Sequence, residues 1–302
     1  MTEHDQPPAP ARKGLKALAI VLGWSVLFGL IAVGFALSVT FLVGLGVARS
    51  VGGAGEWLGV IAPAQIVVQG GALLAGGLVA SYLVGLRRLG MSLADLRWRG
   101  EGVGSMPRGF GIGLLYGIVP AVGVLVASVV VGDARWVADQ GSLGSWAASG
   151  GAIGAVLAPA ALAEEVLFRG VPLVLMAAVV GRGSAVALVA AVFGMAHFMN
   201  PGVTSLGVAN VALAGVLLGT VFYGVGGIWS AFGAHLGWNA TLASSGAAVS
   251  GVPFDVPFLD YEAGGPAWLT GGSFGPEGGI LATVMLTAAV IVAVRRVRSA
   301  EE

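Results

Sequence analysis

Long apolar runs separated by short polar segments dominate the chain. A helix needs about 20 apolar residues to cross the hydrocarbon core of a bilayer. The run at 184–199 is shorter than that, whereas 16–47 and 149–180 are long enough to tilt, kink or project. We expect about eight transmembrane helices, with seven or nine as alternatives. The pattern predicts them at 16–47, 58–86, 110–131, 149–180, 184–199, 204–223, 228–247 and 279–294.

The composition agrees with a membrane protein. Of the 302 residues, 57% are apolar and 10% are charged, whereas a soluble domain carries about 25% charged residues. A soluble enzyme and a disordered chain are therefore excluded. The formal net charge is +0. The chain therefore has no surplus of basic residues that would indicate a nucleic-acid partner. The absence of Cys excludes disulfides, thiolate zinc sites and Cys nucleophiles. The predicted fold is all-α, a single polytopic membrane domain over 13–302 in the lipid bilayer.

Small residues and basic residues give this domain its expected packing and orientation. Gly109, Gly113 and Gly117 recur every four residues, a spacing that lets helix backbones approach closely in lipid. Basic residues flank alternate ends of the apolar runs, which predicts that both termini are cytoplasmic. Residues 1–12 are polar and Pro-rich, and we expect a disordered cytoplasmic tail. The acidic loop 248–277, which ends at Glu277, would face outward. The basic residues behind this orientation are Arg12, Lys13, Lys16, Arg87, Arg88, Arg97, Arg99, Arg108, Arg295, Arg296 and Arg298.

Few ionisable residues interrupt the apolar runs, and all of them fall between 153 and 235. A charged group at membrane depth costs about 2.5–3.5 kcal/mol and marks a candidate functional site. The alternative is an ion-pair cluster that only locks the helices together. The residues concerned are Glu164, Glu165, Arg169, His197 and His235.

Helical spacing divides the two carboxylates. Glu165 and Arg169 stand at i and i+4 with the acid first, the favourable order for a helical ion pair. Consecutive residues point about 100° apart on a helix, so Glu164 faces another direction. We therefore expect Glu165 to be neutralised by Arg169, and Glu164 to be available for acid–base chemistry.

The two histidines each share a helix face with a residue four positions away, namely Phe193 before His197 and Asn239 after His235. An imidazole beside a carboxylate can activate water or ligate a metal, and an imidazole with a carboxamide can stabilise an oxyanion. Glu164 and His197 lie at similar distances from the turn at 181–183, so an antiparallel helix pair brings them to one level. His235 fits this arrangement only on a short or broken helix.

Other intramembrane hydrolases do not match these residues. A zinc protease of the site-2 type needs H-E-x-x-H, and no His here precedes a Glu. Presenilin-like proteases need two Asp residues at membrane depth, and every Asp here lies in a tail or loop. A G-x-S-x-G string, as in rhomboid proteases, occurs at 271–275 in a polar loop with no His after it in the chain.

The chain resembles the CPBP intramembrane proteases, which include the type II CAAX prenyl endopeptidases and the bacteriocin-processing proteins. The resemblance covers a core at about 150–246 and rests on three motifs in the family's order and spacing. These are Glu164-Glu165-Val166-Leu167-Phe168-Arg169-Gly170, Phe193-x-x-x-His197 and His235-x-x-x-Asn239.

This resemblance implies an intramembrane endopeptidase and a role for each motif residue. Glu164 would activate water, with His197 orienting it. His235 and Asn239 would stabilise the oxyanion. The supporting residues would be Glu165, Arg169 and Phe193. This mechanism needs no cofactor, and the alternative is zinc held by Glu164, His197 and His235.

The sequence bears only weakly on the substrate. Arg outnumbers Lys and Ala, Gly and Val abound, which suggests a GC-rich bacterial genome, where prenylated CAAX proteins are not expected. The expected partner is therefore a membrane-associated peptide or protein at the cell membrane. A non-catalytic scaffold, regulator or transporter, held by a buried ion-pair cluster, is the rival hypothesis.

Overall fold

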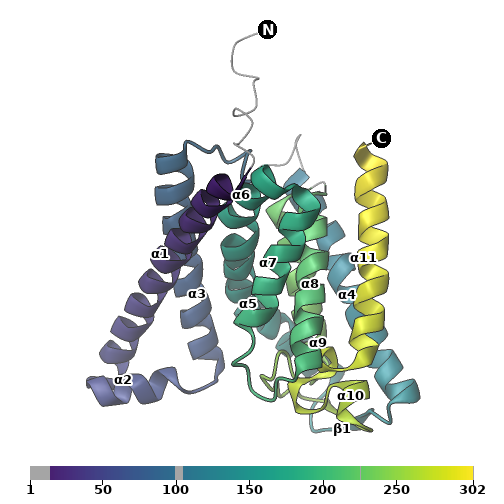
Figure 1. The fold of residues 1–302 in the computed structure, drawn as a ribbon. Helices are drawn as coiled ribbons and strands as arrows, with labels where there is room; N and C mark the ends of the chain where they lie inside the picture. Colours follow the sequence, from purple (N-terminus) through teal and green to yellow (C-terminus); the bar gives the residue numbers. More distant parts are fainter. Residues whose placement is uncertain (1–13, 99–104, 225, 302) are drawn as a thin grey trace.

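The computed structural model describes residues 14–98, 105–224 and 226–301 (Figure 1). The predicted tail at 1–12, together with Lys13 and Arg99, lies outside these residues. The helices are α1 (Leu15–Ala48), α2 (Val51–Leu58), α3 (Pro63–Ala80) with its π-helical continuation η1 (Ser81–Arg88), α4 (Ser105–Val131), α5 (Leu143–Arg169), α6 (Val171–Val180), α7 (Arg182–Ala196), α8 (Ser205–Phe222), α9 (Ile228–Ser244), α10 (Ala267–Thr270), the short 3₁₀ helices η2 (Gly272–Phe274) and η3 (Pro276–Gly278), and α11 (Ile280–Glu301).

The all-α prediction is confirmed, with one small addition. Strands β1 (Arg135–Ala138) and β2 (Leu259–Glu262) form an antiparallel two-stranded ribbon. An exposed ion pair of 2.6 Å joins Arg135 to Glu262 across it. The ribbon ties the segment after α4 to the long loop after α9, two parts of the chain that lie far apart in sequence.

Each predicted apolar run corresponds to helix, but the run at 149–180 is divided at Gly170. A Cβ at Gly170 would lie 2.4 Å from the carbonyl oxygen of Val166. Pro172, at the first turn of α6, has no N–H to continue the helical hydrogen bonds. α5 therefore ends at Arg169, and α6 begins as a separate helix at Val171.

Five helical segments among the described residues are long and apolar enough to cross a membrane, and they support a multi-pass membrane protein. The predicted count of eight spans goes beyond these five and stays a prediction. α5, α7 and α9, which carry the ionisable cluster, are not among the five. The five segments are Leu15–Ala48, Pro63–Arg88, Ser105–Val131, Ser205–Phe222 and Ile280–Ser299.

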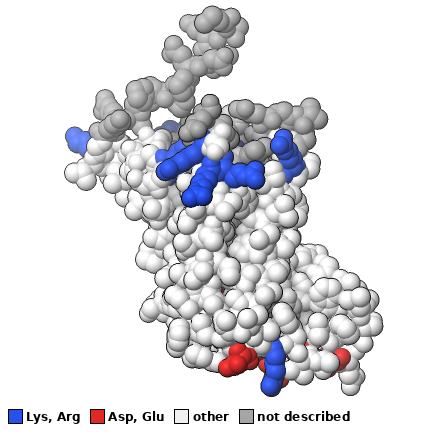
Figure 2. All heavy atoms as spheres, turned by 90° about the vertical axis from the view of Figure 1, so that its right-hand side faces the viewer, with Lys and Arg blue, Asp and Glu red and all other residues white. Residues whose placement is uncertain are grey.

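The two ends of the molecule differ in charge. α1 begins and α11 finishes at the same end (Figure 1). Figure 2 shows most of the visible Lys and Arg gathered at that end, and Asp and Glu at the opposite end together with one basic side chain. Arg87 and Arg88 in the last turn of η1 and Arg298 in the last turn of α11 belong to the basic end.

α4 and α9 pack closely because α4 presents glycine to α9. A Cβ at Gly113 would lie 2.2 Å from the carbonyl oxygen of Ser230, and a Cβ at Gly117 would lie 2.1 Å from that of Ala234. Any side chain at these positions would separate the two helices. This contact sets the position of α9, the helix that carries His235 and Asn239.

Candidate active site

The last turn of α5 holds a fully buried ion pair. Glu165 and Arg169 both have side-chain exposures of 0%, and Arg169 Nη1 lies 3.0 Å from Glu165 Oε1. Arg169 Nη2 also donates to the carbonyl oxygen of Gly215 on α8, at 3.2 Å. The guanidinium lies 4.4 Å from the centre of the Phe193 ring. The predicted i, i+4 contact is present, and it joins α5 to α7 and α8.

Both histidines have one ring nitrogen committed to an acceptor. His197 directly follows the last residue of α7 and caps this helix. Its Nδ1 lies 2.8 Å from the carbonyl oxygen of Phe193. His235 lies within the short helix α9, and its Nδ1 lies 2.7 Å from Glu165 Oε1. A carbonyl and a carboxylate oxygen only accept, so Nδ1 is the donor in each ring. Nε2 of each ring is therefore the nitrogen left for other partners.

These two Nε2 atoms both face Glu164. Glu164 Oε2 lies 3.8 Å from Nε2 of His197 and 3.7 Å from Nε2 of His235. The Glu164 side chain is 27% exposed, yet its Oε2 is buried and has no hydrogen-bond partner within the described part of the chain. A buried polar atom without a partner is uncommon in folded proteins. The structure thus brings the three predicted residues together and gives Glu164 and Glu165 different surroundings.

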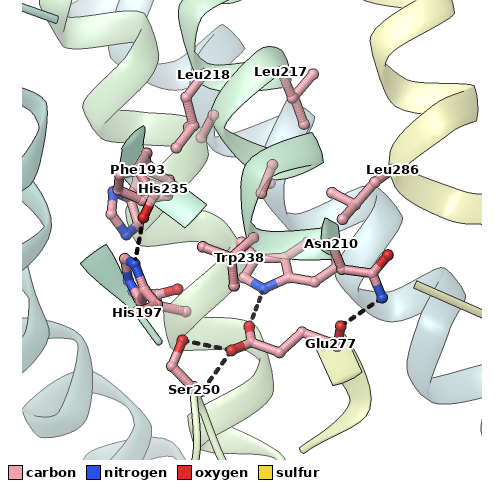
Figure 3. A pocket seen from close by; sticks show the side chains of 15 residues that line it. Phe193, His197, Asn210, Leu217, Leu218, His235, Trp238, Ser250, Glu277 and Leu286 are labelled. Atoms are coloured by element: carbon pink, nitrogen blue, oxygen red, sulfur yellow. Dashed lines mark hydrogen bonds between the residues drawn. The ribbon is translucent and has the colours of Figure 1, made fainter. Parts of the chain in front are cut away.

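A cavity beside the histidines reaches Asn239. It offers about 40 Å³ to the centres of water molecules, which is room for a few of them. The side chain of Asn239 lines it and makes no hydrogen bond to any residue that the structure describes. Figure 3 shows the apolar wall, formed by leucines of α8 and α11, opposite the histidines. Its lining includes Phe193, His197, Leu217, Leu218, His235 and Leu286.

A second carboxylate, Glu277, lines the same cavity, and its sequence pattern did not predict this place. We expected Glu277 in an acidic loop on the outward side of the membrane, and that placement stays a prediction, but its burial was not expected. Only 5% of Glu277 is exposed, because η3 turns inward and the carboxylate bonds to Trp238 and Ser250 (Figure 3). Its Gly- and Pro-rich surroundings give no periodic signal, and its partners lie 39 and 27 positions away.

The residues around Glu164 fit zinc in chemistry but less well in spacing. One carboxylate and two imidazoles are an adequate zinc donor set. An acceptor on the second nitrogen of each imidazole is also typical of metal-binding histidines. However, only one trio of His, Asp or Glu among the described residues has ligand atoms that all lie within 4.8 Å of one another. It is Asp139, Asp255 and Asp260, all exposed near the β-ribbon.

Comparison with known families identifies part of the chain. Residues 144–241 match the family model described as type II CAAX prenyl endopeptidase Rce1-like. The match spans about a third of the 302 residues and runs from the start of α5 into α9. It contains every residue of the three motifs and confirms the resemblance to the CPBP and CAAX proteases. Searches of curated proteins and of solved structures gave no match.

Proposed function

Because residues 144–241 form an Rce1-like domain, we propose that the protein is an intramembrane endopeptidase that hydrolyses membrane-associated peptides or proteins with a water activated by Glu164. One observation carries the proposal. Glu164 Oε2 is buried without a hydrogen-bond partner in the described chain, and it faces Nε2 of both histidines. The Oε2 atom of Glu165 also has no hydrogen-bond partner in the described chain, but its Oε1 is held by Arg169 and His235. A carboxylate that only locked helices together would be expected to be held in this way, whereas the side chain of Glu164 makes no hydrogen bond to any described residue.

Glu164 and His197 supply the water-activating pair of this mechanism. Their 3.8 Å separation is too long for a direct hydrogen bond and suits one water molecule in contact with both groups. His197 is oriented by the Phe193 carbonyl oxygen, so its Nε2 can hold the water. Glu164 then accepts a proton as the water oxygen attacks the carbonyl carbon of the scissile bond, and the carbonyl π electrons move to the oxygen. When this intermediate collapses, the C–N bond breaks and Glu164 returns the proton to the leaving amine nitrogen.

His235 and Asn239 supply the donors for the tetrahedral intermediate. They lie one turn apart on α9, and both line the cavity. Because His235 already donates through Nδ1 to Glu165, its Nε2 donates only when the ring is protonated. Glu165 then stabilises the imidazolium, which links the buried ion pair to the chemistry. The amide of Asn239 is the second donor, and donors placed where charge develops lower the barrier.

Zinc is the alternative way to activate the same water. Glu164, His197 and His235 would hold the ion, which would polarise the carbonyl and acidify the water. We propose the metal-free mechanism because it does not require Glu164, His197 and His235 to move closer together, as zinc binding would.

The bilayer delivers the substrate in this proposal, and the basic end of the molecule faces the cytoplasm of a bacterial cell. Arginines at the ends of η1 and α11 support this orientation, because Lys and Arg favour cytoplasmic loops. A reporter fused after Arg298 is expected to read cytoplasmic. A periplasmic reading would contradict both the orientation and the number of spans.

The test of the function compares membrane proteomes from cells with the wild type and with Glu164→Ala, each with and without a chelator. The expected result is a cleavage product that requires Glu164 and is indifferent to chelation. Loss of this product on chelation, with recovery on adding zinc, would favour the metal mechanism. The absence of any Glu164-dependent product would instead favour the rival reading, a scaffold, regulator or transporter whose ion pairs only hold it together.

A further inference from the structure

The carboxylate of Glu277 joins two segments that approach the cavity from different parts of the chain. Its Oε2 accepts a hydrogen bond from Trp238 Nε1 at 2.9 Å. Its Oε1 accepts from the backbone N and from Oγ of Ser250, each at 2.5 Å. A carboxylate only accepts, so both oxygens are committed to this junction (Figure 3).

The Trp238 bond acts on the helix that carries the proposed oxyanion donors. Trp238 directly precedes Asn239 and follows His235 by three positions on α9. At about 100° per residue, the three side chains leave neighbouring sides of the helix. α4 holds α9 from another side, where a Cβ at Gly117 would lie 2.5 Å from the backbone N of Trp238. An indole held by Glu277 therefore limits rotation of α9 about its own axis.

The Ser250 bonds act on the segment that carries the other histidine. The carbonyl oxygen of Ser250 accepts from Asn200 Nδ2 at 3.0 Å. The backbone N of Asn200 in turn donates to the carbonyl oxygen of His197 at 3.1 Å. Ser250 holds a left-handed φ of 48°, a conformation that non-glycine residues rarely adopt. The junction thus continues from Glu277 through Ser250 to the turn that begins at His197.

The backbone of Glu277 is fixed independently of its side chain. Its carbonyl oxygen accepts from Asn210 Nδ2 of α8 at 2.8 Å. Asn210 Oδ1 accepts from Thr283 Oγ1 of α11 at 2.6 Å. A change in the carboxylate therefore alters the junction while η3 keeps its other anchors.

We infer that Glu277 is a positioning residue, which holds the His197 turn and the His235–Asn239 face of α9 in register across the cavity. The inference deepens the proposed function and rests on it for its catalytic consequence. Glu277 acts through Trp238 and Ser250, and we assign it no contact with substrate.

Glu277→Gln is the informative substitution because it keeps the shape and removes one acceptor oxygen. The amide NH₂ must then face either the indole N–H or the Ser250 donors. A displacement of catalytic groups by about 1 Å can cost ~10²-fold in rate, so kcat is expected to fall by about 10–100-fold with KM unchanged. Trp238→Phe, which removes only the indole donor, should reproduce part of this loss. Glu262→Gln is the matched control, since Glu262 is an exposed carboxylate at the end of β2 and is paired with Arg135.

Two readouts separate positioning from general loss of structure. In an Asn239→Ala background, Glu277→Gln is expected to cost clearly less than it does in the wild type, because one donor that it positions is already gone. In nanodiscs, ¹⁵N-histidine NMR should show shifted His197 and His235 signals for Glu277→Gln and unchanged signals for Glu262→Gln. The NMR result does not depend on proteolysis, so a failure of the proposed function would leave the inference testable. Unchanged histidine signals, or equal losses in both backgrounds, would overturn it.

Discussion

Two neighbouring carboxylates of α5 lie in opposite kinds of surroundings. On the ion-pair side, Glu165 contacts both Arg169 and His235 and is fully buried. On the histidine side, the buried Oε2 of Glu164 lies opposite two imidazole nitrogens. Oε2 of both carboxylates lacks a hydrogen-bond partner in the described chain, but only Glu165 is held through its other oxygen. The i, i+4 ion pair thus does more than stabilise α5. It takes up Oε1 of Glu165, whereas the side chain of Glu164 makes no hydrogen bond to any described residue.

The largest effect is expected on the histidine side. Glu164→Ala removes the proposed base, and we expect turnover to be lost while the protein still assembles, because no hydrogen bond of its Oε2 is broken. Cleavage of a client in isolated membranes measures the first point, and yield with thermal unfolding in detergent measures the second. Turnover that survives this change would leave the two carboxylates with no functional difference.

The opposite pattern is expected on the ion-pair side. Arg169→Ala leaves Glu165 charged and buried, and removing one partner of a buried pair costs about 3–5 kcal/mol. Lower yield and a lower unfolding temperature should therefore appear before any specific loss of activity. Arg135→Ala removes an ion pair that is exposed and serves as the control. Equal stability of the two variants would show that the buried pair does not hold the helices.

A smaller loss is expected from Asn239→Ala. Removing one donor of an oxyanion site typically costs about 10²–10³ in kcat, so this variant should be slow but measurable and should fold normally. Kinetics with a purified client would separate kcat from KM. A change confined to KM would place Asn239 in substrate binding and leave His235 as the single donor.

The smallest effect concerns the packing of α4 against α9, the helix that carries His235 and Asn239. Gly117→Ala places a Cβ 2.1 Å from the carbonyl oxygen of Ala234, and overpacking of this kind costs about 1–3 kcal/mol. Gly111→Ala, on the same helix with nothing within 4 Å of its Cβ, is the matched control. Unfolding in detergent should distinguish the two variants, and equal midpoints would show that α4 does not set the position of α9.

Local spacing predicted the parts of this site that lie within one helix. The Glu165–Arg169 contact follows from a four-residue interval, and counting residues from the turn at 181–183 placed Glu164 and His197 at one level. His235 needed a short helix, and α9 has 17 residues. The contacts of Glu277 were not predictable, since they cross 27 to 39 positions between loops and helices. Hydrophobic patterning carries no information on which loop turns inward.

One matched pair of variants separates the roles of Glu164 and Glu165. Glu164→Gln and Glu165→Gln make the same chemical change at adjacent positions, so turnover and unfolding are measured on both in parallel. We predict that Glu164→Gln abolishes turnover and unfolds like the wild type, whereas Glu165→Gln unfolds at a clearly lower temperature. Equal losses of stability in the two variants, or turnover retained by Glu164→Gln, would show that the two carboxylates do not have separate roles.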